Sequence, residues 1–277
     1  MADQGPSTFD RSEEIIPRSS RGILPSLFVS HGAPTLALDP DKGGELASIA
    51  QLFPEPRAVL VVSAHWESRA PTIGTVLPRP LLYDYAGFPE ELYRVEYAAP
   101  PAADLAQRVE SALRPWNIAR AIDRGLDHGV WVPLLHMFPR ANVPVLQMSL
   151  PGRLSGAELL KIGAALAPLR TEGVLILASG SLTHNLRLSR FEDPTPPPAW
   201  AIEFDTWCFD VLRRFDLDSL ADYRRRAPAL HVAHPTEEHF LPLLIAAGAA
   251  SHVPPKVTFP ITGFEHRSMS RRAVLLE

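Results

Sequence analysis

The sequence predicts an α/β fold, with a single three-layer domain whose central, mostly parallel or mixed sheet is flanked by helices. Apolar strand-like segments alternate with helical ones along the chain, as in α/β domains. Residues 24–30, 58–63 and 174–178 form short, continuous apolar runs, which are typical of strands buried on both faces. Each run is followed by serine and then histidine within a few residues. This repetition indicates polar side chains gathered at one edge of the sheet.

Further strands are expected where short β-branched runs are bounded by turn residues. These additional strand candidates are residues 72–77, 119–122, 143–148 and 257–261. Residues 79–101 are rich in aromatic residues and proline, so this stretch is either a surface loop packed by its own side chains or a wall over a pocket.

Helices are expected where apolar residues recur at helical spacing or where a start signal stands before such a pattern. Ser155 and Glu158 are spaced as a capping box, and Pro235, Glu237 and Glu238 suit the first turn of a helix that starts near His234. The predicted helices are residues 44–52, 102–113, 155–170, 199–215, 219–227 and the segment from 234, with residues 126–136 forming a loop that enters a helix.

Composition limits the class of protein. The chain has 277 residues, 46% hydrophobic content and a net charge of −4, which fits a globular protein with one large core or two modest domains and gives no sign of nucleic-acid binding or of a membrane span. Residues 1–21 are polar and lack the apolar core of a signal peptide, so we expect a disordered tail followed by one catalytic domain, residues 22–277. A monomer and a small homo-oligomer are equally consistent with the sequence.

Cysteine use narrows the chemistry further. Cys208 is the only cysteine, which excludes a disulfide within the chain and a thiolate metal cluster. It lies in the helical stretch 199–215, where we expect it to be a small buried apolar residue. A reducing, cytoplasmic location is compatible with this.

Histidines at the strand ends suggest a metal site. Neutral imidazole is a common ligand of divalent iron and zinc, and His31 and His65 follow two predicted strands. A third ligand has to come from elsewhere, and the alternative is a set of hydrogen-bonded loop histidines. His234 and His239 lie roughly 140° apart on an ideal helix, so one metal is not expected to take both. The remaining candidates for the third ligand are His184, His234, Glu237, Glu238 and His239.

The histidines also belong to sequence blocks that resemble a known family, the class III extradiol ring-cleavage dioxygenases, and within it the 4,5-DOPA dioxygenase extradiol branch. The blocks occur in the family's order between about residues 24 and 248. They are Ser30-His31-Gly32-Ala33-Pro34, Ser63-Ala64-His65-Trp66, Asp127-His128-Gly129-Val130-Trp131, Ser179-Gly180-Ser181-Leu182-Thr183-His184-Asn185 and His234-Pro235-Thr236-Glu237-Glu238-His239-Phe240-Leu241-Pro242.

The resemblance implies one mononuclear non-haem iron(II), with zinc(II) possible in its place. His31, His65 and His239 match the metal ligands of the DOPA-type branch. The protocatechuate-cleaving branch uses two histidines and a glutamate, the facial triad of oxygenases. A neutral set of three histidines also suits zinc, and Glu238 is the alternative third ligand.

The resemblance also assigns the substrate pocket. His184 matches the catalytic acid/base, for which we expect a pKa near neutrality, and His128 matches a histidine that steadies the substrate. We expect both to contact substrate, together with His234, Ser30 and Tyr83, although for His234 a position at a helix cap is equally consistent.

The implied reaction is extradiol cleavage of a catechol by dioxygen. The best candidate is 4,5-cleavage of L-DOPA to a semialdehyde that cyclises to a betalamic-acid type product. A zinc-dependent hydrolase and a non-catalytic binding protein on the same fold are the alternatives. The presence of His184 and His128 favours catalysis, since metal binding alone would not need them.

Overall fold

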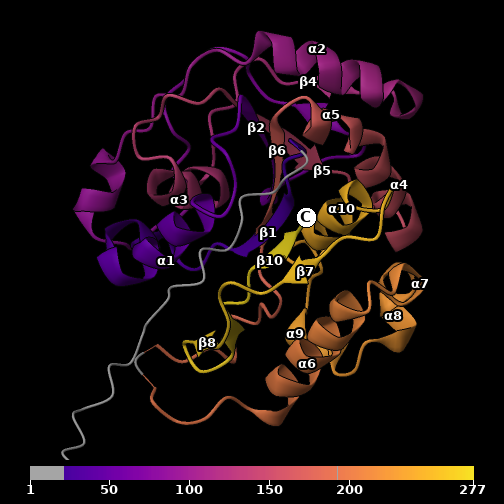
Figure 1. Cartoon of the computed structure of the whole chain (residues 1–277). Coiled ribbons are helices and arrows are strands. Elements are labelled where there is room, and N and C mark those ends of the chain that lie inside the picture. The colour runs from indigo at the N-terminus through magenta and orange to yellow at the C-terminus, as the bar shows by residue number, and fades with distance from the viewer. Residues whose placement is uncertain (1–21, 192) are drawn as a thin grey trace, which may run out of the picture.

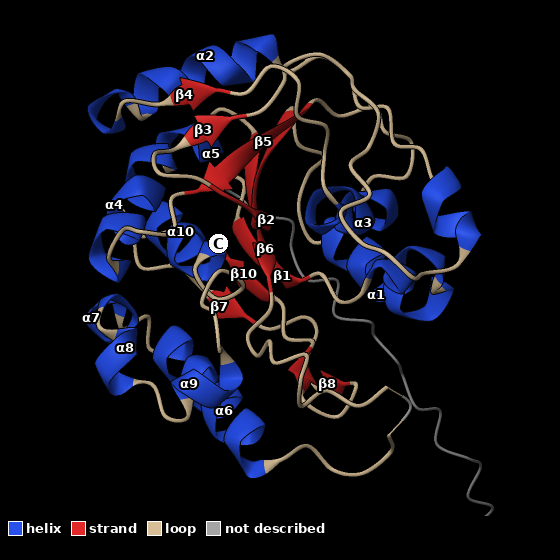
Figure 2. Ribbon diagram, turned by 180° about the vertical axis from the view of Figure 1, so that it is seen from behind, coloured by secondary structure: helices blue, strands red, loops and turns tan. Residues whose placement is uncertain are grey.

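A mixed sheet forms the centre of the molecule, and the computed structural model describes residues 22–191 and 193–277. The tail expected to be disordered, residues 1–21, lies outside the described residues. The sheet has eight strands (Figure 2). In spatial order they are β4 (Ala119–Arg120), β3 (Thr72–Ile73), β5 (Val145–Leu150), β2 (Ala58–Glu67), β6 (Val174–Gly180), β1 (Ser26–Ser30), β10 (Val274–Leu276) and β7 (Val257–Thr258).

The four central strands, β5, β2, β6 and β1, pair in parallel. Antiparallel pairs flank them, since β3 runs against β5 and β10 against β1. This confirms the predicted mixed sheet and the α/β class. Because parallel strands end at the same edge, the residues at the ends of β1, β2 and β6 are brought together there.

Helices cover both faces of the sheet (Figure 1), which gives the expected three layers. They are α1 (Pro40–Ala50), α2 (Ala103–Ala112), α3 (His128–Met137), α4 (Gly156–Leu166), α5 (Pro168–Thr171), α6 (Ala199–Arg213), α7 (Leu217–Ala221), α8 (Tyr223–Arg226), α9 (Leu230–Ala233) and α10 (Pro242–Ala249). A separate two-stranded sheet joins β8 (Phe264–Glu265) to β9 (Met269–Ser270).

Alternate residues of β2 divide the core into two halves. Leu60 faces the core that α4 and α10 complete, whereas Val59 and Val61 face the core that α1 and α3 complete. The strand is therefore buried on both faces, as its continuous apolar run predicts. The predicted capping box is present at the start of α4, where Ser155 and Glu158 exchange hydrogen bonds, and Cys208 is buried in α6 as expected.

The prediction for the segment after His234 was wrong. Pro235, Glu237 and Glu238 were expected in the first turn of a helix, but residues 234–241 form turns, and α10 begins at Pro242. Tertiary contacts explain the difference, since Glu237 accepts a hydrogen bond of 2.5 Å from the Tyr223 hydroxyl. The first residue of α10 is a proline, in line with the general preference, but it is Pro242 rather than Pro235.

The end of strand β2 bears on the position of the site. The strand β2 continues to Glu67, so His65 lies within the end of the strand rather than after it.

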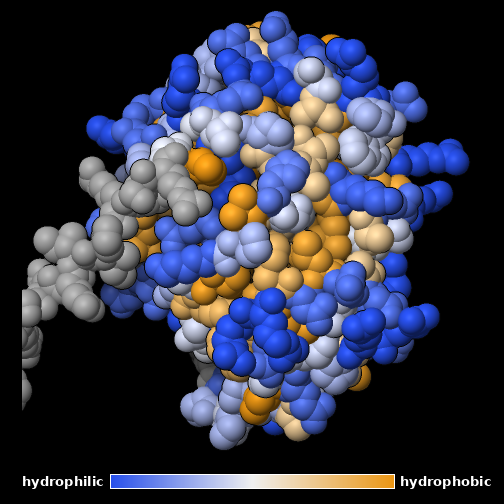
Figure 3. Space-filling view, turned by 45° about the vertical axis from the view of Figure 1, so that its right-hand side comes forward, coloured by the Kyte–Doolittle hydropathy of each residue, from blue (hydrophilic) through white to orange (hydrophobic). Residues whose placement is uncertain are grey.

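Among the described residues, we find no helix with the length and apolar character that crossing a membrane requires. The surface in Figure 3 is mostly hydrophilic, with a band of hydrophobic residues down the middle of that face.

Candidate active site

Five histidines from different elements meet at the carboxyl edge of the parallel strands. His31 follows β1, His65 ends β2 and His184 follows β6, while His128 is the first residue of α3 and His239 precedes α10. The spatial order of the strands, β2–β6–β1, brings the three strand-end histidines to neighbouring positions. Residues as far apart in sequence as 31 and 239 therefore line one site.

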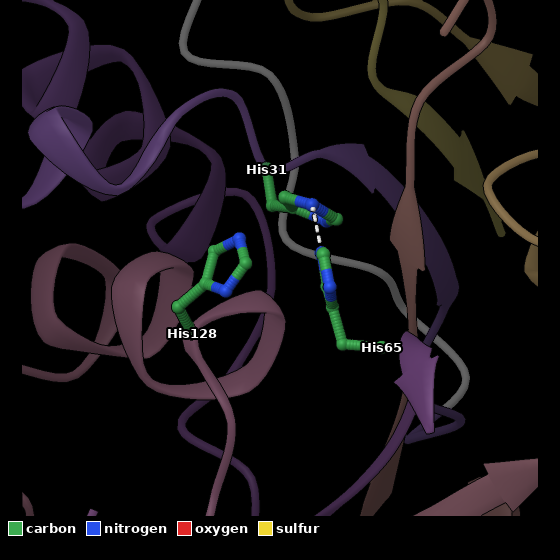
Figure 4. Close-up of side chains that lie close together, drawn as sticks. All are labelled: His31, His65 and His128. Atoms are coloured by element: carbon green, nitrogen blue, oxygen red, sulfur yellow. Dashed lines mark hydrogen bonds between the residues drawn. The ribbon is translucent and has the colours of Figure 1, made fainter. Parts of the chain in front are cut away.

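Three of the rings form a nearly equilateral triangle. The ring centroids lie 4.9 Å apart for His31 and His65, 5.4 Å for His31 and His239, and 5.0 Å for His65 and His239. The Nε2 atoms of His31 and His65 lie 3.0 Å apart, as the dashed line in Figure 4 marks. These nitrogens are therefore directed toward one small region.

Hydrogen-bond partners on the outer side determine which nitrogen of His31 and His65 carries the proton. The Ser179 hydroxyl donates to the Gly129 carbonyl, so its oxygen accepts from His31 Nδ1, at 2.9 Å. The Nδ1 atom of His65 lies 3.4 Å from Oδ2 of Asp84, a carboxylate that can only accept a hydrogen bond and so favours the proton on Nδ1. Both rings then present an unprotonated Nε2 to the centre, the form that binds a metal.

His239 follows the same pattern and leaves a buried atom without a partner. Its Nδ1 lies 2.9 Å from Oε1 of Glu238, which accepts the hydrogen bond. Its Nε2 is buried and has no hydrogen-bond partner among the described residues. A buried polar atom without a partner costs about 1–3 kcal/mol, so this nitrogen points to a group that the site takes up.

The ring spacing fits three imidazoles around one metal ion. Two imidazoles that bind one ion through Nε2 at ~2.1 Å, with a ligand angle of roughly 90–110°, have centroids roughly 4.5–5.3 Å apart. The triangle of His31, His65 and His239 lies at or close to this range. Among the described residues, two groups have possible ligand atoms within 4.8 Å of one another, His31, His65 and His128 in one and His184, Glu238 and His239 in the other. In the first group, the centroids of His65 and His128 are only 3.9 Å apart.

Burial keeps the candidate ligands neutral. Desolvation, followed by the charges of neighbouring histidines, lowers the pKa of His31 and His239 well below the usual value. Desolvation and the charge of His128 lower the pKa of His65 to about 4. At neutral pH these rings are therefore uncharged, with one nitrogen free of a proton, as metal binding requires.

His184 stacks on His239. The two rings are 3.4 Å apart between centroids and nearly parallel, at 8°. Burial lowers the pKa of His184 to about 4, which differs from the near-neutral value that we expected. The physical reason is desolvation among neutral rings, so at neutral pH His184 is in the basic form that accepts a proton.

His128 enters the site from the side of α3 (Figure 4). Asp84 Oδ1 accepts hydrogen bonds from its Nδ1, at 2.8 Å, and from its backbone nitrogen, at 3.1 Å. Its ring lies 5.4 Å from that of His31, edge to face, and 5.6 Å from that of Tyr85. His128 therefore lies beside the proposed ligands with one nitrogen held and the other free to meet a substrate.

Two glycines permit this close arrangement. A Cβ atom at Gly180 would lie 2.1 Å from the His239 carbonyl oxygen, and one at Gly129 would lie 2.5 Å from the Ser63 hydroxyl and 3.0 Å from the His65 ring. The absence of a side chain at Gly180 lets the His239 turn lie against the end of β6, where Ser181 donates to the His239 carbonyl. Gly129 likewise lets α3 begin beside His65.

Two of the predicted substrate residues have other partners. His234 is buried, lies 2.8 Å through Nε2 from the Leu182 carbonyl, and packs against Phe204 at 5.2 Å between ring centroids. The Ser30 hydroxyl donates to the Arg272 carbonyl, at 3.1 Å. Contact of either side chain with a substrate stays a prediction.

The aromatic stretch 79–101 takes one of its two predicted roles, a loop packed by its own side chains, and its role as a wall over a pocket stays a prediction. The hydroxyl of Tyr83 donates to the Val95 carbonyl, so the loop is packed by its own side chains, and this bond occupies the hydroxyl of a predicted substrate residue. The same loop carries Asp84 to His65 and His128. We had not predicted a role for Asp84, because an acidic residue in an aromatic loop has no characteristic spacing from its partners.

Comparisons with known proteins identify the family of the chain. The family model described as the catalytic LigB subunit of aromatic ring-opening dioxygenase matches residues 28–275. The 4,5-DOPA dioxygenase extradiol of Beta vulgaris is 40% identical over 244 residues, which cover 84% of this chain and 89% of that protein. The protein of the same name from Escherichia coli (strain K12) is 34% identical over 273 residues, or 95% and 97% of the two chains.

A solved structure gives the same result. The crystal structure of an uncharacterized protein from Escherichia coli K12 has a TM-score of 0.77 and 30% sequence identity, and the match covers 92% of this chain and 100% of that one. The predicted family and enzyme class are thereby confirmed. The chain belongs to the LigB family of aromatic ring-opening dioxygenases and is an extradiol dioxygenase, an oxidoreductase with a histidine-rich potential metal site.

Proposed function

We propose that the chain binds one divalent metal ion, iron(II) in the active enzyme, through Nε2 of His31, His65 and His239. The observation that carries this proposal is the buried Nε2 of His239, which has no hydrogen-bond partner in the described part of the chain and belongs to a triangle of rings spaced for one ion. Zinc(II) suits the same neutral ligands and is the form most convenient for binding measurements. Glu238 holds Nδ1 of His239, which supports an outer role for it rather than ligation.

We further propose L-DOPA as substrate, with cleavage between carbons 4 and 5 to a semialdehyde that cyclises to a betalamic-acid type product. The support is the name shared by the relatives from Beta vulgaris and Escherichia coli, 4,5-DOPA dioxygenase extradiol. Their matches cover 84% and 95% of this chain, and the residues matched by the family model, 28–275, include all five site histidines.

The side chains present suit the proton transfers of this reaction. When bound, the iron supplies the one-electron chemistry that allows dioxygen to react with a catechol. His184, neutral at pH 7, takes a proton from a catechol hydroxyl and later returns it to the oxygen released on ring opening. The negative charge of a bound catecholate raises the pKa of a neighbouring imidazole, which helps His184 to hold that proton. His128, whose Nδ1 is held by Asp84, accepts a hydrogen bond from a substrate hydroxyl through its free Nε2.

Oxygen consumption tests the proposed reaction. We expect the iron(II)-loaded protein, given L-DOPA in air-saturated buffer, to consume about one dioxygen per catechol and to form a yellow product. His184→Ala should keep its metal but lose ~10²–10⁴-fold in turnover, because a positioned acid/base contributes about that much. His252→Ala, at an exposed histidine, is the matched control and should behave as wild type.

The contrary outcomes are specific. No oxygen uptake by the iron-loaded protein, across catechols with amino-acid, carboxylate and neutral side chains, would reject the proposed reaction. Hydrolysis of an ester or amide by the zinc-loaded protein without oxygen uptake would instead favour a hydrolase. Metal binding with neither activity would favour a binding protein.

A further inference from the structure

One carboxylate, that of Asp84, lies between a proposed metal ligand and the substrate histidine. Its Oδ1 accepts hydrogen bonds from Nδ1 of His128, at 2.8 Å, and from the backbone nitrogen of His128, at 3.1 Å. Its Oδ2 lies 3.4 Å from Nδ1 of His65. The two rings belong to different elements, the end of β2 and the start of α3, so Asp84 links both sides of the site.

The contacts determine where each ring carries its proton. An ionised carboxylate only accepts hydrogen bonds, so His65 and His128 each carry a proton on the Nδ1 atom that faces Asp84. In the neutral ring with this tautomer, Nε2 is the nitrogen without a proton. For His65, this nitrogen lies 3.0 Å from Nε2 of His31, on the side where the metal is proposed to bind. The other tautomer, with the proton on Nε2, would leave His65 unable to ligate through Nε2.

The loop that carries Asp84 is held on both sides of it. The hydroxyl of Tyr83 donates to the Val95 carbonyl, at 2.8 Å, and that of Tyr85 donates to the Leu92 carbonyl, at 3.0 Å. Both bonds stay within the loop, so the backbone around Asp84 is fixed before any ligand arrives. Such support is typical of groups that orient metal ligands.

A second carboxylate near the site serves a different purpose. Asp127 precedes His128 and is buried, but its oxygens accept hydrogen bonds from the Ser63 hydroxyl, at 2.7 Å, and from Arg124, at 3.1 Å. It therefore fixes the start of α3 to β2. The Nδ1 atoms of His65 and His128 lie next to Asp84 instead.

We propose that Asp84 is a positioning residue that sets the tautomers of His65 and His128 together and so couples metal ligation to the substrate pocket. This inference rests on the proposed function for the roles of the two histidines. The proton positions and the metal affinity can nevertheless be measured without turnover, so the two proposals fail separately.

Proton positions are measured first, by long-range ¹H–¹⁵N NMR of zinc-loaded and metal-free protein labelled in histidine. We expect His65 and His128 to be protonated at Nδ1 in the wild type. In Asp84→Asn, the amide offers a single acceptor oxygen, so at least one ring should lose that tautomer. An Nε2-protonated ring at either histidine in the metal-free wild type would overturn the proposal, whatever the variant does.

Zinc affinity is measured next, by competition with a chelator. We expect Asp84→Asn to bind zinc ~10–100-fold more weakly, the usual loss when an outer partner of a metal-binding histidine is removed. Asp123→Asn is the matched control, because its carboxylate is exposed and pairs with Arg79 at the surface. Unchanged affinity in folded Asp84→Asn would overturn the proposal, whereas weaker zinc binding by a chain that consumes no oxygen would reject only the proposed reaction.

Kinetic measurements separate the effect of Asp84 on the substrate pocket, through His128, from its effect on metal binding, through His65. At equal iron occupancy, Asp84→Asn should raise KM for the catechol, and this increase should disappear when the same change is made in His128→Ala, because residues acting through one another are not additive. The weaker zinc affinity should persist in the double variant, since it acts through His65. Fully additive KM effects would overturn the coupling to His128.

Discussion

The two edges of the parallel strands bury polar side chains in opposite ways. At the amino edge, the guanidinium of Arg170 donates to the carbonyls of Leu24, at 2.7 Å, Ala249, at 2.9 Å, and Leu276, at 3.0 Å. At the carboxyl edge, Nε2 of His239 is buried, and none of residues 22–191 and 193–277 gives it a hydrogen-bond partner. At the amino edge the protein itself supplies the hydrogen-bond acceptors of Arg170, whereas at the carboxyl edge a bound ligand would supply the partner of His239.

The two edges of the sheet therefore have different roles: the amino edge stabilises the fold, and the carboxyl edge serves ligand binding. Burial lowers the pKa of Arg170 to about 10, which still leaves it charged at neutral pH, and its three acceptors tie together the start of β1, the end of α10 and β10. At the carboxyl edge, by contrast, the buried Nε2 of His239 lowers the free energy of unfolding of the metal-free protein, and a bound ion would offset this loss. Changes at the two edges should therefore affect stability with opposite signs.

Acid should produce the largest effect, through the carboxyl edge. Burial lowers the pKa of His65, His184 and His234 to about 4, so these rings take up protons near pH 6.5 only when the chain unfolds. The free energy of unfolding of the metal-free protein should fall as pH drops from ~6.5 to ~4, by about 3 kcal/mol for a fully buried ring such as His234.

Urea unfolding at pH 7 and pH 5, followed by circular dichroism, checks this. His234→Leu should show a shallower dependence on pH, because it removes one of the protons taken up on unfolding. Equal unfolding free energies at the two pH values would contradict the account.

Removal of Arg170 should produce the next largest effect. Arg170→Met keeps the aliphatic bulk but leaves three buried carbonyls without donors, at about 1–3 kcal/mol each, so we expect a loss of roughly 3 kcal/mol or more in unfolding free energy. Zinc affinity should stay unchanged. Arg108→Met is the control: Arg108 pairs with Glu172 at the surface, where ion pairs contribute about 0–1 kcal/mol. A similar effect of the two substitutions would show that Arg170 has no special role.

Removal of His239 should have the smallest effect on stability and the opposite sign. His239→Leu replaces a buried nitrogen without a partner by apolar atoms, so the metal-free protein should be unchanged or more stable by about 1 kcal/mol. The same variant should lose zinc binding. Strong destabilisation of the metal-free protein would mean that His239 supports the fold rather than a ligand.

The sequence predicts the edge of the sheet better than it predicts the loops around it. His31, His65 and His184 follow apolar runs, and parallel pairing then brings strand ends together whatever the loops do. The short strand β10 was missed, because a three-residue strand has too few residues to show a pattern. The helix predicted from Pro235 failed because tertiary contacts of Glu237 outweigh a local start signal.

The supporting groups of the site were harder to predict. Asp84 lies about twenty residues after His65 and more than forty before His128, and no motif relates them, so only the folded loop reveals the contact. The pKa of His184 was also beyond the sequence, because it depends on how deeply the ring is buried among other neutral rings.

A crystal structure of the zinc-loaded protein, with anomalous data collected at the zinc edge, tests the central claim most directly. We predict a single strong peak bonded to Nε2 of His31, His65 and His239, at ~2.0–2.1 Å from each, with His128 unbound beside it. A peak bonded to His128 in place of His239, or no peak at this edge of the sheet, would contradict the account.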